Sequence, residues 1–219
     1  MTLRGLLFDL DGTLVDSLPD IGGAMNAVLA ELELPQHPLL AYREKVGEGV
    51  GRLVERALPA DRPDLQPAAV ARFREVYGAR LIQETRPYPG IAELLDGLAA
   101  LGVPCAVCSN KPQDMTERVT AALLGRWTWF GVEGQREGRP HKPDPTMALE
   151  LAARLGAEPR DLGFVGDTKT DMDTARGAGM VPVGVLWGFR ARAELEAHGA
   201  RVVVEAPGEL LEWAQTSAP

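Results

Sequence analysis

Short apolar runs recur along the chain and are separated by segments with helical periodicity. The runs lie at residues 3–8, 103–108, 162–166, 181–186 and 201–204. They are continuous rather than alternating, which is typical of parallel strands that are covered on both faces. Each run therefore predicts a buried strand of one largely parallel sheet.

Two of the segments between these runs have apolar residues on one helical face. The first set is Ile91, Leu94, Leu95, Leu98 and Leu101, followed by Gly102; the second is Ala148, Leu151, Ala152 and Leu155, followed by Gly156. Glycine after the last periodic residue is a common helix stop. Strands that alternate with helices predict an α/β fold with a doubly wound, mainly parallel sheet and right-handed crossovers.

Residues 16–82 interrupt this alternation. They contain no convincing strand, but helix-spaced apolar sets occur at 18–32, 53–58 and 70–77, separated by clusters of Pro and Gly. This pattern predicts an all-helical domain inserted after the first strand. We therefore expect residues 1–15 and 83–219 to form the sheet domain and residues 16–82 to form a helical cap.

Composition narrows the classes of partner. The chain has 219 residues, 45% of them hydrophobic, and a formal net charge of −8. This charge argues against nucleic acid or an anionic membrane as the main partner, whereas a small anionic substrate can be bound through a local cation.

No apolar run approaches the ~18 residues of a membrane span, and Asp9 interrupts the first run too early for a signal peptide. We expect a cytoplasmic monomer or homodimer.

The cysteines and histidines do not predict a metal or redox centre. Cys105 and Cys108 lie three positions apart on a predicted strand, so their side chains point to opposite faces, and we expect buried thiols. The histidines, at positions 37, 141 and 198, show no ligand spacing.

Polar residues follow three of the predicted strands directly. In open α/β sheets, ligands bind at the carboxyl ends of the strands, where loops and helix N-termini converge. The first strand is followed by Asp9-Leu10-Asp11-Gly12, the second by Ser109-Asn110-Lys111, and the third by Asp167, with Asp171 four residues further on. We expect these three clusters to meet at one edge.

Four carboxylates at one edge require a compensating charge. At about 4 Å and an effective dielectric constant near 20, each pair repels by roughly 4 kcal/mol. Mg²⁺ prefers oxygen ligands and commonly binds a few carboxylates together with a phosphate oxygen. Asp9, Asp11, Asp167 and Asp171 are therefore the candidate metal ligands.

The same arrangement suits phosphoryl transfer. An aspartate beside a metal ion can attack phosphorus to form an aspartyl-phosphate, and a second carboxyl group two residues later can move the protons. The remaining phosphate oxygens need donors and a cation. Ser109, the backbone N–H of Asn110 and Lys142 could supply them.

Four motifs carry a resemblance to a known family. They are FDLDGTLVDS at 8–17, VCSNKP at 107–112, HKPDP at 141–145 and VGDTKTDMDTARGAG at 165–179. In this order they make the chain resemble the haloacid dehalogenase-like hydrolase superfamily, in particular its phosphoglycolate phosphatase-like members with a helical cap.

The resemblance implies a role for each matching residue. Asp9 would be the nucleophile and a Mg²⁺ ligand, and Asp11 the acid/base, with its backbone carbonyl on the metal. The other implied roles are phosphate binding by Ser109 and Asn110, a charge clamp at Lys142, direct metal binding by Asp167, and metal binding or support of its ligands by Asp171. The insert at 16–82 would close over the substrate and exclude water.

One stretch of the predicted cap has two interpretations. The segment KVGEGVGR at 45–52 is either a flexible interhelical turn or a loop that contacts the leaving group of the substrate. In the second case Arg52 could pair with a substrate carboxylate. Lys45 is the only lysine of the predicted cap, and nothing in its setting favours the Schiff base that phosphonate hydrolysis would need.

The expected function is therefore hydrolysis of a small phosphorylated metabolite with Mg²⁺ as cofactor, and 2-phosphoglycolate is the best single guess. A phosphosugar mutase, or a phosphatase for a sugar phosphate, nucleotide or pyrophosphate, stays open. The acidic Asp11 argues against a dehalogenase, in which this position is typically not acidic. A non-enzymatic phospho-acceptor module would have no use for a helical insert of this size.

Overall fold

A computed structural model describes residues 3–217 and contains one six-stranded, all-parallel sheet. The strand order is β5 (Trp129–Gln135), β4 (Cys105–Pro112), β1 (Gly5–Phe8), β6 (Leu162–Gly166), β7 (Val181–Val185) and β8 (Val202–Val204). The predicted fold class is confirmed, and each of the five apolar runs overlaps one strand, although β4 continues past the run at 103–108 to Pro112.

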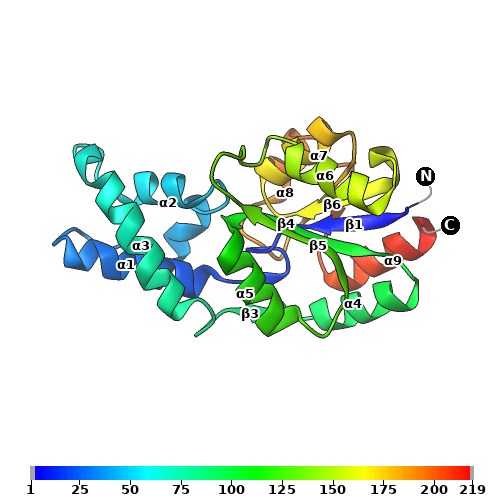
Figure 1. The fold of residues 1–219 in the computed structure, drawn as a ribbon, viewed down its shortest axis with the longest axis horizontal. Helices are drawn as coiled ribbons and strands as arrows, with labels where there is room; N and C mark the ends of the chain where they lie inside the picture. The colour runs from blue at the N-terminus through cyan, green and yellow to red at the C-terminus, as the bar shows by residue number, and fades with distance from the viewer. Residues whose placement is uncertain (1–2, 218–219) are drawn as a thin grey trace.

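Helices cover both faces of the sheet (Figure 1). On one face, α6 (Thr146–Leu155) and α7 (Lys169–Ala178) pack against Leu7, Ala106 and Phe164. The other face is covered by α4 (Ile91–Ala100), α5 (Gln113–Leu124) and α9 (Pro207–Ser217). The short helix α8 (Arg192–Ala197) lies between β7 and β8 in the chain and contacts α7. Burial on both faces explains the continuous apolar runs of the strands.

Three helices of the predicted cap lie together beyond one end of the sheet (Figure 1). They are α1 (Leu18–Glu31), α2 (Val50–Ala57) and α3 (Gln66–Arg80), and two 3₁₀ segments, Leu39–Glu44 and Pro63–Leu65, connect them. α3 packs against both α1 and α2. A third 3₁₀ segment, Pro159–Asp161, leads into β6.

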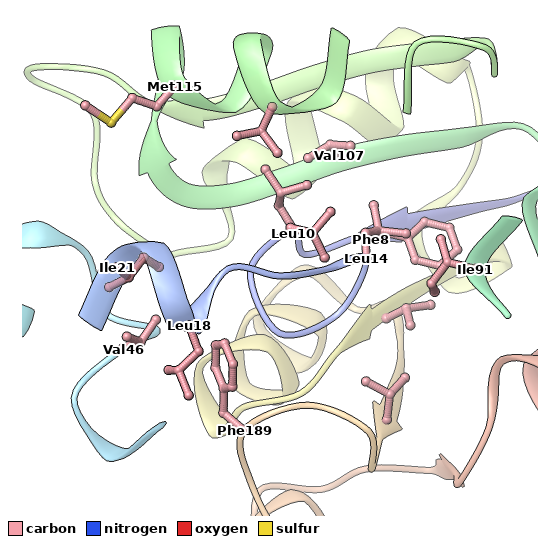
Figure 2. Close-up of a cluster of buried hydrophobic side chains, with 14 of the residues drawn as sticks. Phe8, Leu10, Leu14, Leu18, Ile21, Val46, Ile91, Val107, Met115 and Phe189 are labelled. Atoms are coloured by element: carbon pink, nitrogen blue, oxygen red, sulfur yellow. The ribbon is translucent and has the colours of Figure 1, made fainter. Parts of the chain in front are cut away.

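The helical group shares a hydrophobic core with one face of the sheet. Figure 2 shows part of this cluster. Its labelled members include residues of the sheet, of the turn after β1 and of the helical insert, among them Phe8, Val107, Leu10, Leu14, Ile21 and Val46. All of them are at least nine-tenths buried. The helices therefore add to the apolar burial of the sheet domain instead of standing apart from it.

A short two-stranded ribbon lies where the chain passes between the sheet domain and the helical insert. β2 (Val15–Asp16) and β3 (Arg86–Pro87) pair antiparallel, with Val15 opposite Pro87 and Asp16 opposite Arg86. Two-residue strands have no recognisable periodicity, and the sequence does not predict them.

Asp20 fixes the start of α1 to the segment that returns from the insert. Its side chain is fully buried, and Oδ2 accepts hydrogen bonds from the Glu84 N–H (2.9 Å), the Thr85 N–H (2.8 Å) and the Thr85 hydroxyl (2.7 Å). A buried carboxylate is tolerated when such donors surround it. The Arg80 guanidinium, 3.8 Å from Oδ1, adds positive charge.

We predict that Asp20→Ala lowers the free energy of unfolding by about 3 kcal/mol, because buried N–H and hydroxyl donors lose a charged acceptor. Urea unfolding followed by circular dichroism measures the change. The exposed Asp61 offers a matched control, and Asp61→Ala should stay within about 0.5 kcal/mol of the wild type. Equal effects of the two substitutions would contradict a tethering role for Asp20.

Candidate active site

Three carboxylates meet at the carboxyl end of the central strands. Asp9 follows β1, Asp167 follows β6, and Asp171 lies in the first turn of α7. All three are buried, and one oxygen from each lies within 4.8 Å of the others. The expected convergence of strand ends thus brings together residues that are more than 150 positions apart.

Backbone hydrogen bonds to the Leu10 carbonyl close the turn after β1. The Leu10 carbonyl accepts hydrogen bonds from the N–H groups of Thr13 (3.3 Å), Leu14 (3.0 Å) and Val15 (3.0 Å), and the Leu10 side chain enters the core shown in Figure 2. Gly12 has φ +89°, and a Cβ there would lie 2.4 Å from Asp167 Oδ2. This position therefore needs glycine for its conformation and for the close approach.

Asp167 is held by donors from two loops. Its Oδ1 accepts from the Thr13 hydroxyl (3.1 Å) and its Oδ2 from the Phe189 N–H (2.7 Å). The Trp187 indole N–H donates to the Thr13 carbonyl (2.9 Å), which joins these two loops to each other. No sequence motif points to Phe189, because it contributes a backbone N–H, which every residue except proline has.

Lys142 lies between two of the carboxylates. Its Nζ is 2.7 Å from Asp171 Oδ1 and 3.1 Å from Asp9 Oδ1, and its side chain is 1% exposed. Burial alone would lower the pKa of Lys142, but Asp171 and Asp9 outweigh it and hold this pKa above its usual value. The ammonium therefore stays charged at neutral pH.

Asp171 has a second task at the start of α7. Its Oδ2 accepts from the backbone N–H (3.0 Å) and hydroxyl (2.7 Å) of Thr168, the residue that caps the helix. This is a capping box, which stabilises a helix N-terminus. The helix start and the carboxylate cluster therefore share one side chain.

The cluster fits a divalent cation. Burial, with Asp171 and Asp11 adding repulsion, raises the pKa of Asp9 to about 6 against the pull of Lys142, and burial with Asp171 and Asp9 nearby raises the pKa of Asp167 well above its usual value. Asp9 Oδ1 is buried without a hydrogen bond, although Lys142 Nζ lies 3.1 Å away. A cation among these oxygens would favour the charged forms and supply the missing partner.

Asp11 faces a different lysine. Lys111 Nζ lies 2.7 Å from Asp11 Oδ1 and 2.9 Å from Oδ2, and it also donates to the Tyr77 hydroxyl (2.5 Å) of α3. The Asp11 carboxylate does not belong to the cluster of Asp9, Asp167 and Asp171. Together, Lys111 and Lys142 offset two of the four negative charges, and the other two match one divalent cation.

Ser109 and Asn110 occupy the end of β4. Ser109 is buried, and its Oγ accepts from the Lys111 N–H (3.4 Å). Asn110 Oδ1 accepts from the Lys142 N–H (2.8 Å), while Nδ2 donates to the carbonyls of Lys142 (3.0 Å) and Gly47 (3.1 Å). The Asn110 side chain thus connects the Lys142 loop to the helical insert.

A cavity of about 50 Å³ lies between the carboxyl end of the sheet and the helices. Its polar lining comes from the residues just described, together with the insert: Asp9, Asp11, Ser109, Asn110, Lys111 and Tyr77. The opposite wall is apolar and includes Ile21, Leu53 and Phe73. A small polar group can reach Asp9 there, next to the apolar wall that the helices contribute.

Comparison with known proteins agrees with this geometry. The family of haloacid dehalogenase-like hydrolases matches residues 3–179. This chain belongs to that family. A phosphoglycolate phosphatase from Caulobacter vibrioides is 35% identical over 203 residues, which cover 91% of this chain and 85% of the relative. A phosphoglycolate phosphatase from Rhodospirillum rubrum is 35% identical over 218 residues, which cover 96% of this chain and 90% of the relative.

Solved structures of similar fold support the assignment. A haloacid dehalogenase-like family hydrolase from Streptococcus pneumoniae superposes with a TM-score of 0.88 at 26% identity, covering 96% of this chain and 98% of that one. A predicted phosphoglycolate phosphatase from Haemophilus somnus superposes with a TM-score of 0.88 at 27% identity, covering 98% of this chain and 99% of that one. Within residues 3–217 of the hydrolase, no helix has the length and apolar character that crossing a bilayer requires.

Arg52 lies outside the cavity of the hydrolase. Its side chain is 56% exposed, and its guanidinium is 2.7 Å from Glu55 and 3.9 Å from Glu48. It lines a separate, open hollow together with His141 and Lys169. The pairing of Arg52 with a substrate carboxylate stays a prediction, and in this conformation two protein carboxylates already face the guanidinium.

The cysteines lie as their spacing on the strand predicts. Cys105 and Cys108 are both unbonded thiols, and they enter the hydrophobic clusters on opposite faces of the sheet. Burial raises the pKa of each thiol to about 12, so neither is a thiolate at neutral pH. Among the histidines, His198 contacts Asp173 (2.9 Å) and His37 contacts the Ala57 carbonyl (2.9 Å), both away from the cavity.

Two arginines connect the helical insert to the loop that holds Asp167. Arg43, in the first 3₁₀ segment, donates to the Gly188 carbonyl. Arg190 donates to the carbonyls of Arg43 and Val46, the latter at 3.1 Å. The insert and the loop at 187–190 therefore contact each other through two guanidinium groups and three backbone oxygens.

We predict that Lys142→Met lowers the free energy of unfolding by roughly 3–5 kcal/mol at pH 7.5 without added metal, since Asp9 and Asp171 lose their shared buried cation. Chemical denaturation measures this change in the free energy of unfolding. Lys169→Met is the control, because Lys169 is 45% exposed and lies 3.8 Å from Glu48, and it should cost less than about 1 kcal/mol. A mild effect of Lys142→Met would contradict the proposed charge balance.

Proposed function

We propose that this hydrolase is a Mg²⁺-dependent phosphatase that converts 2-phosphoglycolate to glycolate and phosphate through an aspartyl-phosphate on Asp9. The observation that carries the proposal is the Asp9 carboxylate, which lies at the cavity with one oxygen free of hydrogen bonds and with Lys142 3.1 Å away. The names of the relatives support this choice of substrate.

In the first step, a carboxylate oxygen of Asp9 attacks the phosphorus. The bond from phosphorus to the glycolate oxygen breaks, and protonated Asp11 gives its proton to that oxygen. Asp11 is suited to this because it lines the same cavity as Asp9 and sits two residues later in the turn after β1. Lys142, fixed between Asp9 and Asp171, offsets the negative charge of the transferring group.

In the second step, water attacks the phosphorus of the aspartyl-phosphate. Asp11, now ionised, takes a proton from this water, the bond to Asp9 breaks, and inorganic phosphate leaves. Lys111, within 2.9 Å of both Asp11 oxygens, holds the carboxylate in place between its two tasks. The Ser109 hydroxyl and the backbone N–H of Asn110 would bind the phosphate oxygens.

We assign Asp9, Asp167 and Asp171 as the side chains that would hold Mg²⁺, with the backbone carbonyl of Asp11 as a further ligand. When bound, the ion supplies positive charge to a phosphate oxygen and keeps the carboxylates ionised. A hard oxygen donor set favours Mg²⁺ over softer metals.

The activity is tested by release of phosphate from 2-phosphoglycolate. We expect turnover by the wild type with Mg²⁺, and a loss of at least about a thousandfold in kcat for Asp9→Asn, because the amide cannot act as a nucleophile. EDTA should abolish turnover, and Mg²⁺ should restore it. Substantial activity of Asp9→Asn, or turnover that survives EDTA, would contradict the mechanism.

Binding of the metal is tested without turnover. At a Mg²⁺ concentration about a hundredfold above its dissociation constant, the free energy of unfolding should rise by about 2.7 kcal/mol. Differential scanning fluorimetry of the wild type and of Asp167→Asn measures the shift of Tm. We expect the shift to be lost in Asp167→Asn, and an equal shift in both proteins would place the ion elsewhere.

A further inference from the structure

The cavity has one cationic side chain in its lining. Of the described residues that line it, Asp9 and Asp11 are acidic, Lys111 is basic, and the others are polar or apolar. The wall that the helices contribute is apolar except for one hydroxyl, that of Tyr77. A charged group on the substrate, other than its phosphate, therefore finds one cationic side chain in this lining, Lys111, with the Tyr77 hydroxyl beside it.

Lys111 directs the Tyr77 hydroxyl group. The three donors of the ammonium are taken up by Asp11 Oδ1 (2.7 Å), Asp11 Oδ2 (2.9 Å) and the Tyr77 oxygen (2.5 Å). Because the Tyr77 oxygen accepts from Lys111, its own proton is left to donate, and no side chain or carbonyl within residues 3–217 accepts it. A hydroxyl polarised by an ammonium is a strong donor to an anion.

The Tyr77 ring is held in place by its surroundings. It stacks on Phe73 with centroids 5.3 Å apart and an interplanar angle of 20°, and Lys111 Nζ lies 4.8 Å from its centroid. The side chain is 2% exposed. Burial and the nearby Asp11 raise the pKa of Tyr77 well above its usual value, so the hydroxyl keeps its proton. A fixed, protonated donor needs little reorganisation when it binds a ligand.

We infer that the Tyr77 hydroxyl, supported by the charge of Lys111, binds a carboxylate on the leaving group and selects short phosphomonoesters that carry this carboxylate beside the ester carbon. The inference rests on the proposed function, because Asp11 must protonate the leaving oxygen. Lys111 bridges Asp11 and Tyr77, and in glycolate the leaving oxygen and the carboxylate carbon are two bonds apart. One small leaving group can therefore reach both residues.

Arg52 is the competing candidate for the same role. Its guanidinium is largely exposed, it faces Glu48 and Glu55, and it does not line the cavity. A long side chain can change rotamer, so the two candidates are best separated by experiment. Tyr77→Phe removes one oxygen and leaves the stacked ring in place.

The experiment compares 2-phosphoglycolate with 2-hydroxyethyl phosphate, in which a neutral hydroxymethyl group replaces the carboxylate. We expect the wild type to prefer the carboxylated ester, and Tyr77→Phe to reduce the ratio of the two kcat/KM values by about tenfold or more, mainly through a higher KM for 2-phosphoglycolate. Tyr42→Phe is the matched control: Tyr42 is a buried tyrosine of the insert that donates to Asn26 (2.7 Å) away from the cavity. The ratio of the two kcat/KM values should be the same in Tyr42→Phe as in the wild type.

Each other outcome overturns a defined statement. An unchanged ratio in Tyr77→Phe, with a thermal midpoint close to that of the wild type, overturns the inference and leaves the phosphatase reaction intact. A ratio that falls in Arg52→Ala but not in Tyr77→Phe moves the carboxylate site to Arg52. A wild type that hydrolyses both esters equally also overturns the inference alone, whereas a wild type that hydrolyses neither ester overturns the proposed function as well.

Discussion

The repulsion among four aspartates at one edge of the sheet is the constraint that shapes the rest of the site. Two lysines reduce this repulsion: Lys142 lies between Asp9 and Asp171, and Lys111 pairs with Asp11. Asp167 depends on neutral donors instead. Each carboxylate therefore has a cation or hydrogen-bond donors that stabilise it in the folded protein. Asp9, Asp167 and Asp171 still lie close enough together to bind one more cation.

The helical insert contributes groups to the site as well as covering it. The Gly47 carbonyl accepts from Asn110, and the Tyr77 hydroxyl accepts from Lys111. The insert also shares the hydrophobic core of one sheet face. A rearrangement of these helices would therefore alter the surroundings of Asp11 and Asn110 at the same time, which couples access to the cavity to its chemistry.

Hydrophobic pattern and strand-end chemistry predict much of this molecule from sequence. The five apolar runs are strands, and Asp9, Asp167 and Asp171 do converge. The edge strand β5 escapes prediction because it pairs on one side only and mixes Gly, Glu and Gln with its apolar residues. The contacts of Lys111 could not be predicted for another reason. Its partners Asp11 and Tyr77 come from segments far away in the sequence, so no local pattern indicates that they meet.

The contact between the insert and the loop at 187–190 has a consequence for sequence change. Arg43 and Arg190 both donate to backbone carbonyls. A backbone oxygen is present whatever the side chain, so a substitution at Val46 leaves the acceptor in place, provided that the local fold survives. Gly188 is different, because a Cβ there would lie 2.3 Å from the Gly12 carbonyl oxygen and 2.4 Å from the Asp167 Cβ. Salt and acid weaken these hydrogen bonds less than they weaken a pair of opposite charges such as Arg190 and Glu44 (3.8 Å), since a carbonyl acceptor carries no titratable charge. The contact between the helical insert and the loop beside Asp167 can thus persist through changes at Val46, whereas Gly188 has to stay glycine.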